Sequence, residues 1–199
     1  MKNDRKLNAK DLINVGLFTI LLSLITMIGS FVGFFPMFMP FIPVVIGLIT
    51  APVFMLYCTK IKKAGMFFIT MLLMGCLYAV TGHGFWTVIS YGIMGLVGEV
   101  ILRKGKYNSI NGSRYAISIA SIACMGQMLP LYISRSAYVE TLIEQGYGAE
   151  YANEIIKYMP SWSFFPILIL GVIATYIGCT FGIKMLKKHF VKAGMVKEF

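Results

Sequence analysis

The fold is decided by 48 consecutive uncharged residues that run from Leu12 to Thr59. They read LINVGLFTILLSLITMIGSFVGFFPMFMPFIPVVIGLITAPVFMLYCT. A helix needs about 20 apolar residues to cross a hydrocarbon core of roughly 30 Å, so this tract is long enough for two crossings. Pro36, Pro40 and Pro43 divide it, because each proline removes a backbone donor and fixes φ. The tract therefore predicts two membrane-spanning helices.

The rest of the chain contains three further uncharged tracts, residues 64–98, 115–134 and 158–183. The first of these is interrupted by the cluster Thr81-Gly82-His83-Gly84, which is typical of a turn and predicts two more helices. Only 13% of all residues are charged, about half the share in soluble domains. We therefore expect an all-α integral membrane protein, a single domain over residues 1–199 with six transmembrane helices. The predicted spans are 12–34, 41–58, 64–81, 84–102, 114–134 and 162–184.

The distribution of lysine and arginine predicts the topology. Short loops rich in these residues stay in the cytoplasm. Four segments on one side of the predicted bundle hold 16 of the 18 basic residues, namely 1–11, 60–63, 103–114 and 184–199. We therefore expect both termini in the cytoplasm and the loop 135–161 outside. The net charge of +10 is scattered over these membrane-flanking pieces, which favours contact with anionic lipid of the bilayer over binding to nucleic acid.

Sequence motifs for energy use and catalysis are missing. The chain contains no GxxxxGK[ST], HExxH or GxSxG pattern, and its four cysteines are isolated from one another. The only acid within a predicted span is Glu99, for which we expect an ion pair with Arg103 one helical turn away. We therefore expect no enzyme activity, no cofactor and no metal site. A stand-alone secondary transporter or channel is the alternative, although charged residues near the midplane and an internal repeat, both typical of that class, are not found.

The loop 135–161 is long for a connection in a compact protein, and loops of this length often act as lids or binding loops. Apolar residues recur at helical spacing between Ala149 and Met159, which predicts a short helix over the mouth of the bundle. A solvated connector is the alternative. Tyr138 belongs to this loop and is a candidate for contact with a ligand.

Candidate ligand-binding residues lie at the outer ends of the predicted spans. His83 and Trp86 come from the turn between spans three and four, and Gln127 and Tyr132 come from span five. Trp162 begins span six. Each also has an ordinary structural interpretation: a hydrogen-bonded histidine, an amide paired with another helix, or an aromatic residue in the interfacial belt. We predict that these residues surround a small-molecule site, because an apolar wall with a few polar groups suits such a ligand.

Small residues form stripes that predict close helix packing. Gly16, Thr19, Ser23, Thr26 and Ser30 lie along one side of span one. Close approach over small residues is a main route to helix association in lipid, so this stripe packs either within the bundle or against another membrane subunit. Further stripes, expected to pack internally, are Gly92, Gly95 and Gly98 in span four and Ala174, Gly178 and Gly182 in span six.

Taken together, the six spans, the proline-rich connection after span one, the basic loop Lys60-Ile61-Lys62-Lys63 and the long outer loop before span six resemble the S components of energy-coupling factor (ECF) transporters. The resemblance covers nearly the whole chain. Within that class, four stretches look most like the Trep-Strep group: 47–55, 82–86, 91–102 and 135–162.

This resemblance implies a substrate-binding subunit of a bacterial importer in the cell membrane. Such subunits bind a micronutrient, such as a vitamin, a metal or a tetrapyrrole-like compound, in an outward cavity. They then associate with a membrane T component and two cytoplasmic ATPase subunits, which would explain why this chain has no ATP-binding motif. S components commonly dock the T component through an Ala-xxx-Ala pair on helix one, and the matching residues here are Gly16, Thr19 and Ser23.

Overall fold

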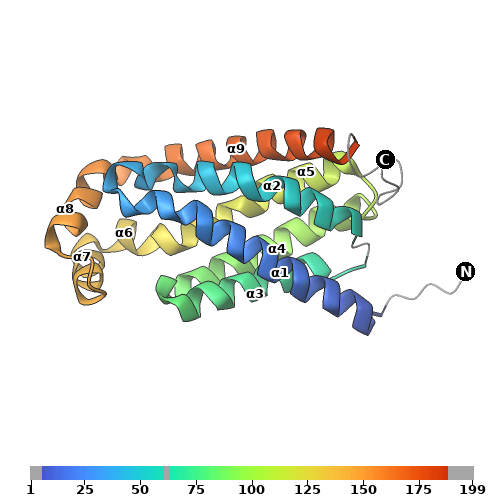
Figure 1. Ribbon diagram of the computed structural model, residues 1–199, viewed down its shortest axis with the longest axis horizontal. Helices are drawn as coiled ribbons and strands as arrows, with labels where there is room; N and C mark the ends of the chain where they lie inside the picture. Colours follow the sequence, from blue (N-terminus) through green and yellow to red (C-terminus); the bar gives the residue numbers. More distant parts are fainter. Residues whose placement is uncertain (1–5, 61–62, 188–199) are drawn as a thin grey trace, which may run out of the picture.

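The computed structural model describes residues 6–60 and 63–187, and this part of the chain consists of helices and connecting turns without a β-strand. Six helical segments are long and apolar enough to cross a membrane, which confirms the predicted fold class (Figure 1). Their bounds differ from the predicted ones by five residues at most. They are Ala9–Phe34, Pro36–Lys60, Met66–His83, Phe85–Lys104, Ile110–Ile133 and Ser161–Met185.

The first two spans are separated at the predicted prolines. Helix α1 (Ala9–Ser30) begins at Asn8, whose side chain and that of Asp11 each accept a hydrogen bond from the other residue's backbone N–H. Two short 3-10 helices follow, η1 (Phe31–Phe34) and η2 (Pro36–Phe41), and they lead into α2 (Ile42–Lys60). Span two therefore starts earlier than predicted, because the proline-rich connection is itself helical.

Spans three and four meet at the predicted turn. Helix α3 (Met66–Tyr78) continues through η3 (Ala79–His83), and α4 (Phe85–Lys104) starts directly afterwards. Gly82 and Gly84 adopt φ values of 96° and 76°, in the left-handed region that a residue without Cβ adopts without strain. The two glycines thus reverse the chain on either side of His83.

Span five combines α5 (Ile110–Ala120), the 3-10 stretch η4 (Ser121–Met128) and α6 (Leu129–Ile133). Span six combines η5 (Ser161–Ser163) with α9 (Phe164–Met185). Helices α2 and α9 lie side by side, and the small residues of α9 bring their backbones together, as predicted. A Cβ on Gly178 would lie 2.9 Å from the Ala51 Cβ, and one on Gly182 would lie 2.7 Å from the Pro52 Cα.

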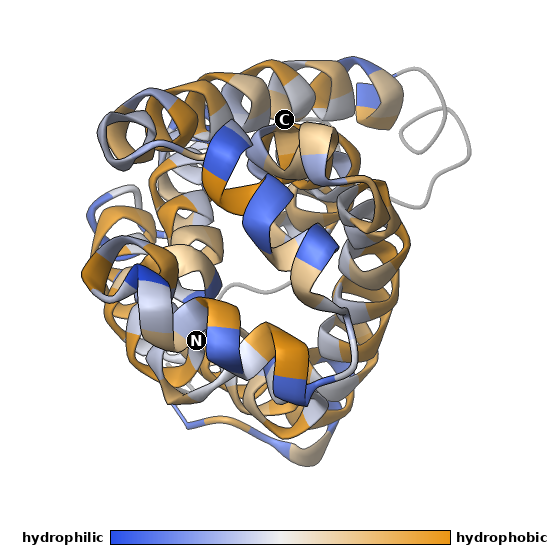
Figure 2. Cartoon of the chain, turned by 90° about the vertical axis from the view of Figure 1, so that its left-hand side faces the viewer, coloured by the Kyte–Doolittle hydropathy of each residue, from blue (hydrophilic) through white to orange (hydrophobic). Residues whose placement is uncertain are grey.

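A helical cap covers one end of the bundle (Figure 2). We use "the cap" for residues 135–161, which contain α7 (Arg135–Glu144) and α8 (Ala149–Tyr158). The helix predicted over residues 149–159 is confirmed as α8, whereas α7 was not predicted. Helix α8 packs on η2 and buries Ala152 and Ile155, and Met159 directly after it is also buried, each 0% exposed. The loop is therefore a packed structural element and not a solvated connector.

The small stripe of span one faces the interior along part of its length. Thr19 and Thr26 are 3% and 6% exposed inside the chain's own bundle. Gly16 is half-buried, and a Cβ placed on it would meet nothing within 4 Å. Thr19 can therefore contact another subunit only if α1 moves, and docking through Gly16, Thr19 and Ser23 stays a prediction.

The predicted ion pair between Glu99 and Arg103 is wrong. The Glu99 carboxylate instead accepts hydrogen bonds from the backbone N–H of Gly65 (2.9 Å) and Phe68 (3.3 Å) and from the Tyr107 hydroxyl (2.6 Å). It thereby satisfies free N–H groups at the start of α3, a position where negative charge is favoured. Within the described ranges, the ion pair that forms joins Lys63 to Asp11, at 2.6 Å.

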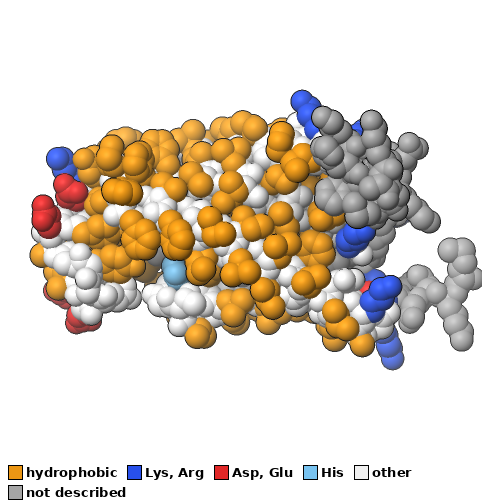
Figure 3. Space-filling view, viewed as in Figure 1, with side chains coloured by type: hydrophobic (Ala, Val, Ile, Leu, Met, Phe, Trp, Pro, Cys, Tyr) orange, Lys and Arg blue, Asp and Glu red, His pale blue; other side chains and the backbone are white. Residues whose placement is uncertain are grey.

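Basic and acidic side chains lie mostly at opposite ends of the molecule, with the acidic groups at the cap (Figure 3). The turn between α4 and α5 lies at the end away from the cap (Figure 1). Six of the basic residues fall outside the described ones: Lys2, Arg5, Lys62, Lys188, Lys192 and Lys197.

This arrangement makes the predicted topology testable. In a variant without the four native cysteines, a cysteine at Gly146 in the cap should react with a membrane-impermeant maleimide in intact cells, whereas one at Lys106 should react only after lysis. Mass-tag electrophoresis measures both reactions. Labelling of the residue 106 position but not the residue 146 position in intact cells would contradict the orientation.

Candidate functional site

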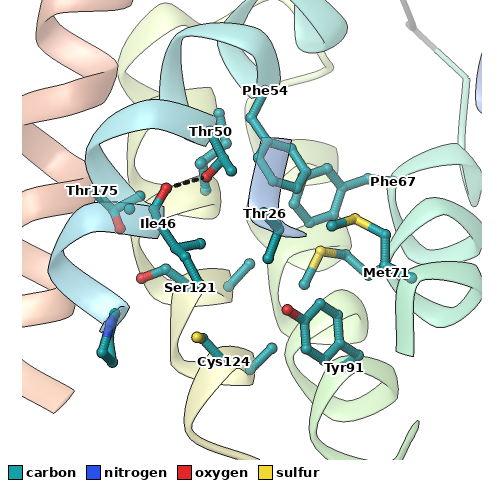
Figure 4. A pocket seen from close by; sticks show the side chains of 16 residues that line it. Thr26, Ile46, Thr50, Phe54, Phe67, Met71, Tyr91, Ser121, Cys124 and Thr175 are labelled. Carbon is teal, nitrogen blue, oxygen red and sulfur yellow. Dashed lines mark hydrogen bonds between the residues drawn. The ribbon is translucent and has the colours of Figure 1, made fainter. Parts of the chain in front are cut away.

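A cavity of about 40 Å³ lies at the centre of the bundle, and all six spans contribute to its wall (Figure 4). We call it the central cavity. Its wall combines hydroxyl groups, aromatic rings and sulfur atoms, and the described side chains that form it carry no charge. The hydroxyl, aromatic and sulfur groups include those of Thr50, Ser121, Thr175, Tyr91, Phe54, Phe67, Met71, Met74 and Cys124.

The helices that carry these groups pack tightly on two sides of the cavity. Gly47 of α2 faces Thr175 of α9 so closely that a Cβ on Gly47 would collide with the Thr175 hydroxyl. On the opposite side, a Cβ on Gly75 would lie 2.8 Å from the Cβ of Tyr91, so α3 and α4 are also in close contact. Figure 4 shows the Tyr91 hydroxyl directed from α4 toward the space between Met71 and Cys124.

An apolar cluster separates the central cavity from the cap. Ile46 and Cys124 line the cavity and also belong to a buried cluster that includes Ile155 and Met159 of the cap. The cavity is thus closed on this side by side chains rather than by backbone. Because pockets for small molecules usually enclose roughly 300 to 1,000 Å³, these side chains would have to move when a ligand enters.

Two side-chain hydrogen bonds join the cap to the rest of the bundle, and a third lies within the cap. The Tyr151 hydroxyl donates to the Gly33 carbonyl (2.5 Å), and Gln145 Nε2 donates to the Gly82 carbonyl (3.4 Å). The third, from Arg135 Nη2 to the Met159 carbonyl (2.5 Å), joins the two ends of the cap itself. The cap is therefore tied to the connection between spans one and two and to the turn between spans three and four.

A second space, an open groove of about 180 Å³, runs between the cap and the ends of spans four and five that lie next to it. We call it the outer groove. It is lined by Trp86, Pro130, Ile133, Ser134, Ala137, Tyr138 and Thr141. Burial raises the pKa of the Tyr138 phenol to about 12, so this hydroxyl stays protonated at neutral pH.

The structure brings some of the predicted site residues together. Trp86 and Tyr138 line the outer groove from opposite sides. Tyr132 is not among the residues that line the groove, although its chain neighbours Pro130 and Ile133 are. Its hydroxyl hydrogen-bonds the Ser163 hydroxyl at 2.9 Å, which connects span five to the start of span six. Since Ser163 donates its own proton to the Pro160 carbonyl, Tyr132 is the donor in this pair.

The other predicted residues line neither of these two spaces. His83 is exposed on the bundle surface beside the cap, with its Nδ1 3.3 Å from the Thr81 hydroxyl and its ring against Tyr78. Gln127 is half-buried and donates to the Cys124 sulfur at 3.6 Å. Trp162 is 73% exposed, as the interfacial-belt interpretation would have it. Ligand contact by these residues stays a prediction.

Sequence reasoning missed most of the central cavity. Thr50, Ser121 and Tyr91 are single polar residues within apolar tracts, and none belongs to a motif. A signal was available, since a polar side chain inside a span needs a partner and therefore tends to face the bundle interior. The depth and helix face of all three would have had to be known together to find the cavity.

Comparison with known proteins gives one match. No curated protein and no solved structure matches the chain. A family model described as a hypothetical bacterial integral membrane protein (Trep_Strep) matches residues 9–192, which include all six spans and the cap. The chain therefore belongs to the Trep_Strep family of bacterial integral membrane proteins.

Proposed function

We propose that this chain is the substrate-binding S component of an ECF-type ABC importer for a micronutrient. In this role it captures a small molecule from outside the bacterial cell and works with a membrane T component and two cytoplasmic ATPase subunits. It binds its substrate without chemical change, so it is not an enzyme. The observation that carries the proposal is a central cavity lined by all six spans beneath a cap.

The two spaces fit successive stages of capture. The outer groove is open and lies between the cap and the bundle, which makes it the entry point. The central cavity is small and lined almost entirely by buried residues, so it is the place where the substrate is held. Between them lies the apolar cluster of the cap, whose Ile155 and Met159 are 0% exposed. Movement of the cap would connect the two spaces.

The uncharged cavity wall weighs against the alternative of a stand-alone secondary transporter. Such transporters couple transport to ions through ionisable residues near the midplane. In this chain the acid within a span, Glu99, caps the start of α3 and is not among the residues that line the cavity.

The proposal predicts that a small molecule co-purifies with the protein. We expect about one molecule per chain, released by denaturation and identified by mass spectrometry. Ile155→Ala should retain much less of it, because loss of fully buried methyl groups weakens the contact of the cap by about 2 to 5 kcal/mol. Ile143→Ala is the matched control, since Ile143 lies in the same cap but is 43% exposed.

Two results would count against binding in this cavity. One is recovery of the folded protein with no small molecule above the level in a blank preparation from untransformed membranes. The other is equal retention by the Ile155→Ala and Ile143→Ala variants, which would show that retention of the bound molecule does not depend on the packing of the cap.

A further inference from the structure

Three of the hydroxyl groups that line the central cavity have their protons engaged in bonds to their own helices. Thr50 Oγ1 donates to the Ile46 carbonyl at 2.7 Å, and Thr175 Oγ1 donates to the Gly171 carbonyl at 2.8 Å. Ser121 Oγ donates to the Ser118 carbonyl at 2.7 Å. A hydroxyl has one proton and two acceptor lone pairs. These three residues, from spans two, six and five, therefore offer oxygen acceptors to whatever occupies the cavity.

The remaining wall is apolar and aromatic. Phe54 and Phe67 form a tilted pair with ring centroids 6.0 Å apart, and Tyr91 faces the same space. Met71 and Met74 lie beside them and are the adaptable part of the wall, because a methionine side chain has three rotatable bonds. This surface suits a flat ring, and rotation of the methionines can widen a cavity whose opposite wall is fixed by the close contact of α2 and α9.

The neutrality of the wall selects against charged ligands. A charge taken out of water requires a counter-charge or a full set of hydrogen bonds, and the described side chains around this cavity supply no counter-charge. An anion would additionally meet the three acceptor oxygens. A neutral molecule needs no counter-charge, and its N–H or O–H groups can donate to the three acceptor oxygens.

We propose that the central cavity binds a compact, uncharged heteroaromatic molecule whose N–H or O–H groups donate to Thr50, Ser121 and Thr175. This inference rests on the proposed function, because it names the substrate class of the same site. It narrows the substrate from micronutrients in general, and it excludes metal ions and large macrocycles from this cavity.

The test uses three probes that share a ring and differ in charge: nicotinamide, which is neutral, nicotinate, an anion, and N1-methylnicotinamide, a cation. Adenine serves as a second neutral probe. The full chain, purified in detergent and freed of bound molecules, is titrated with each probe by calorimetry or equilibrium dialysis. We expect saturable binding of at least one neutral probe, about 10-fold or more tighter than either charged probe.

Variants connect the binding to the cavity. Thr50→Val keeps the shape of the side chain but removes the acceptor oxygen, and it should weaken binding of the neutral probe about 5-fold to 100-fold. Thr59→Val is the matched control, because Thr59 lies on the same helix and also donates to its own helix, at 2.7 Å to the Leu56 carbonyl, but does not line the cavity. Ser121→Ala replaces Thr50→Val if that variant does not fold.

The ligand class is overturned if nicotinate or the methylated cation binds as tightly as the neutral probes, or if no neutral probe binds up to about 10 mM. It is also overturned if the cavity variants bind like the control. These outcomes are independent of the importer role. Selective binding of neutral probes by a chain that has no ATPase partners would refute the importer role and keep the ligand class. Co-purification of ATPases with a chain that binds charged and neutral probes equally well would keep the importer role and refute the ligand class.

Discussion

Gly178→Ala is expected to lower the free energy of unfolding by about 1 to 3 kcal/mol, although it adds a single methyl group. The new Cβ would lie 2.9 Å from the Ala51 Cβ, 2.9 Å from the Leu48 carbonyl oxygen and 3.0 Å from the Gly47 carbonyl oxygen. Two of these neighbours are backbone atoms of α2, so the helices would have to separate. Thermal unfolding of the purified protein in detergent measures the loss.

Gly16→Ala is the matched control for this prediction. Gly16 also lies inside a spanning helix, but a Cβ on it meets nothing within 4 Å. Alanine should be neutral there or slightly stabilising, since it is a better helix former than glycine by about 1 kcal/mol. Equal stability of the two variants would show that the contact between α2 and α9 is not the tight joint described above.

The spans could be predicted because hydrophobic length is a property of the sequence alone. The uncharged tract 12–59, its prolines and the glycines around His83 determined four of the six helices without reference to the rest of the chain. The cap helix α8 was predictable from periodicity, which is also local, since Ala152, Ile155 and Met159 recur at helical spacing. Helix α7 was not, because it buries only Leu142 and has little apolar periodicity.

The site was only partly predictable. Trp86 and Tyr138 could be placed near one rim of the bundle because Trp86 follows the turn between spans three and four and Tyr138 follows the end of span five. The central cavity depends on which faces of six helices meet, and that depends on close approaches such as Gly47 to Thr175. Glu99 illustrates the same limit, since its partners Gly65 and Phe68 belong to another helix and the local pattern suggested Arg103.

The proposed function predicts an all-or-none result for partner subunits. An S component has no source of energy of its own, and this chain contains no GxxxxGK[ST] motif, so import requires ATPases supplied by other chains. The apolar sides of the helices, such as Leu17 and Ile20 of α1, are exposed and available to lipid or to another membrane subunit. The prediction does not depend on knowing the substrate.

The most direct measurement is therefore affinity purification of the tagged chain from its native bacterial membranes in a mild detergent, followed by mass spectrometry of the eluted proteins and an ATPase assay. A tagged, unrelated six-span protein from the same membranes is the control. We predict that one further membrane protein and two P-loop ATPases elute in stoichiometric amounts and that the eluate hydrolyses ATP. Elution of the chain alone, with ATPases no higher than in the control, would contradict the assignment as an importer subunit.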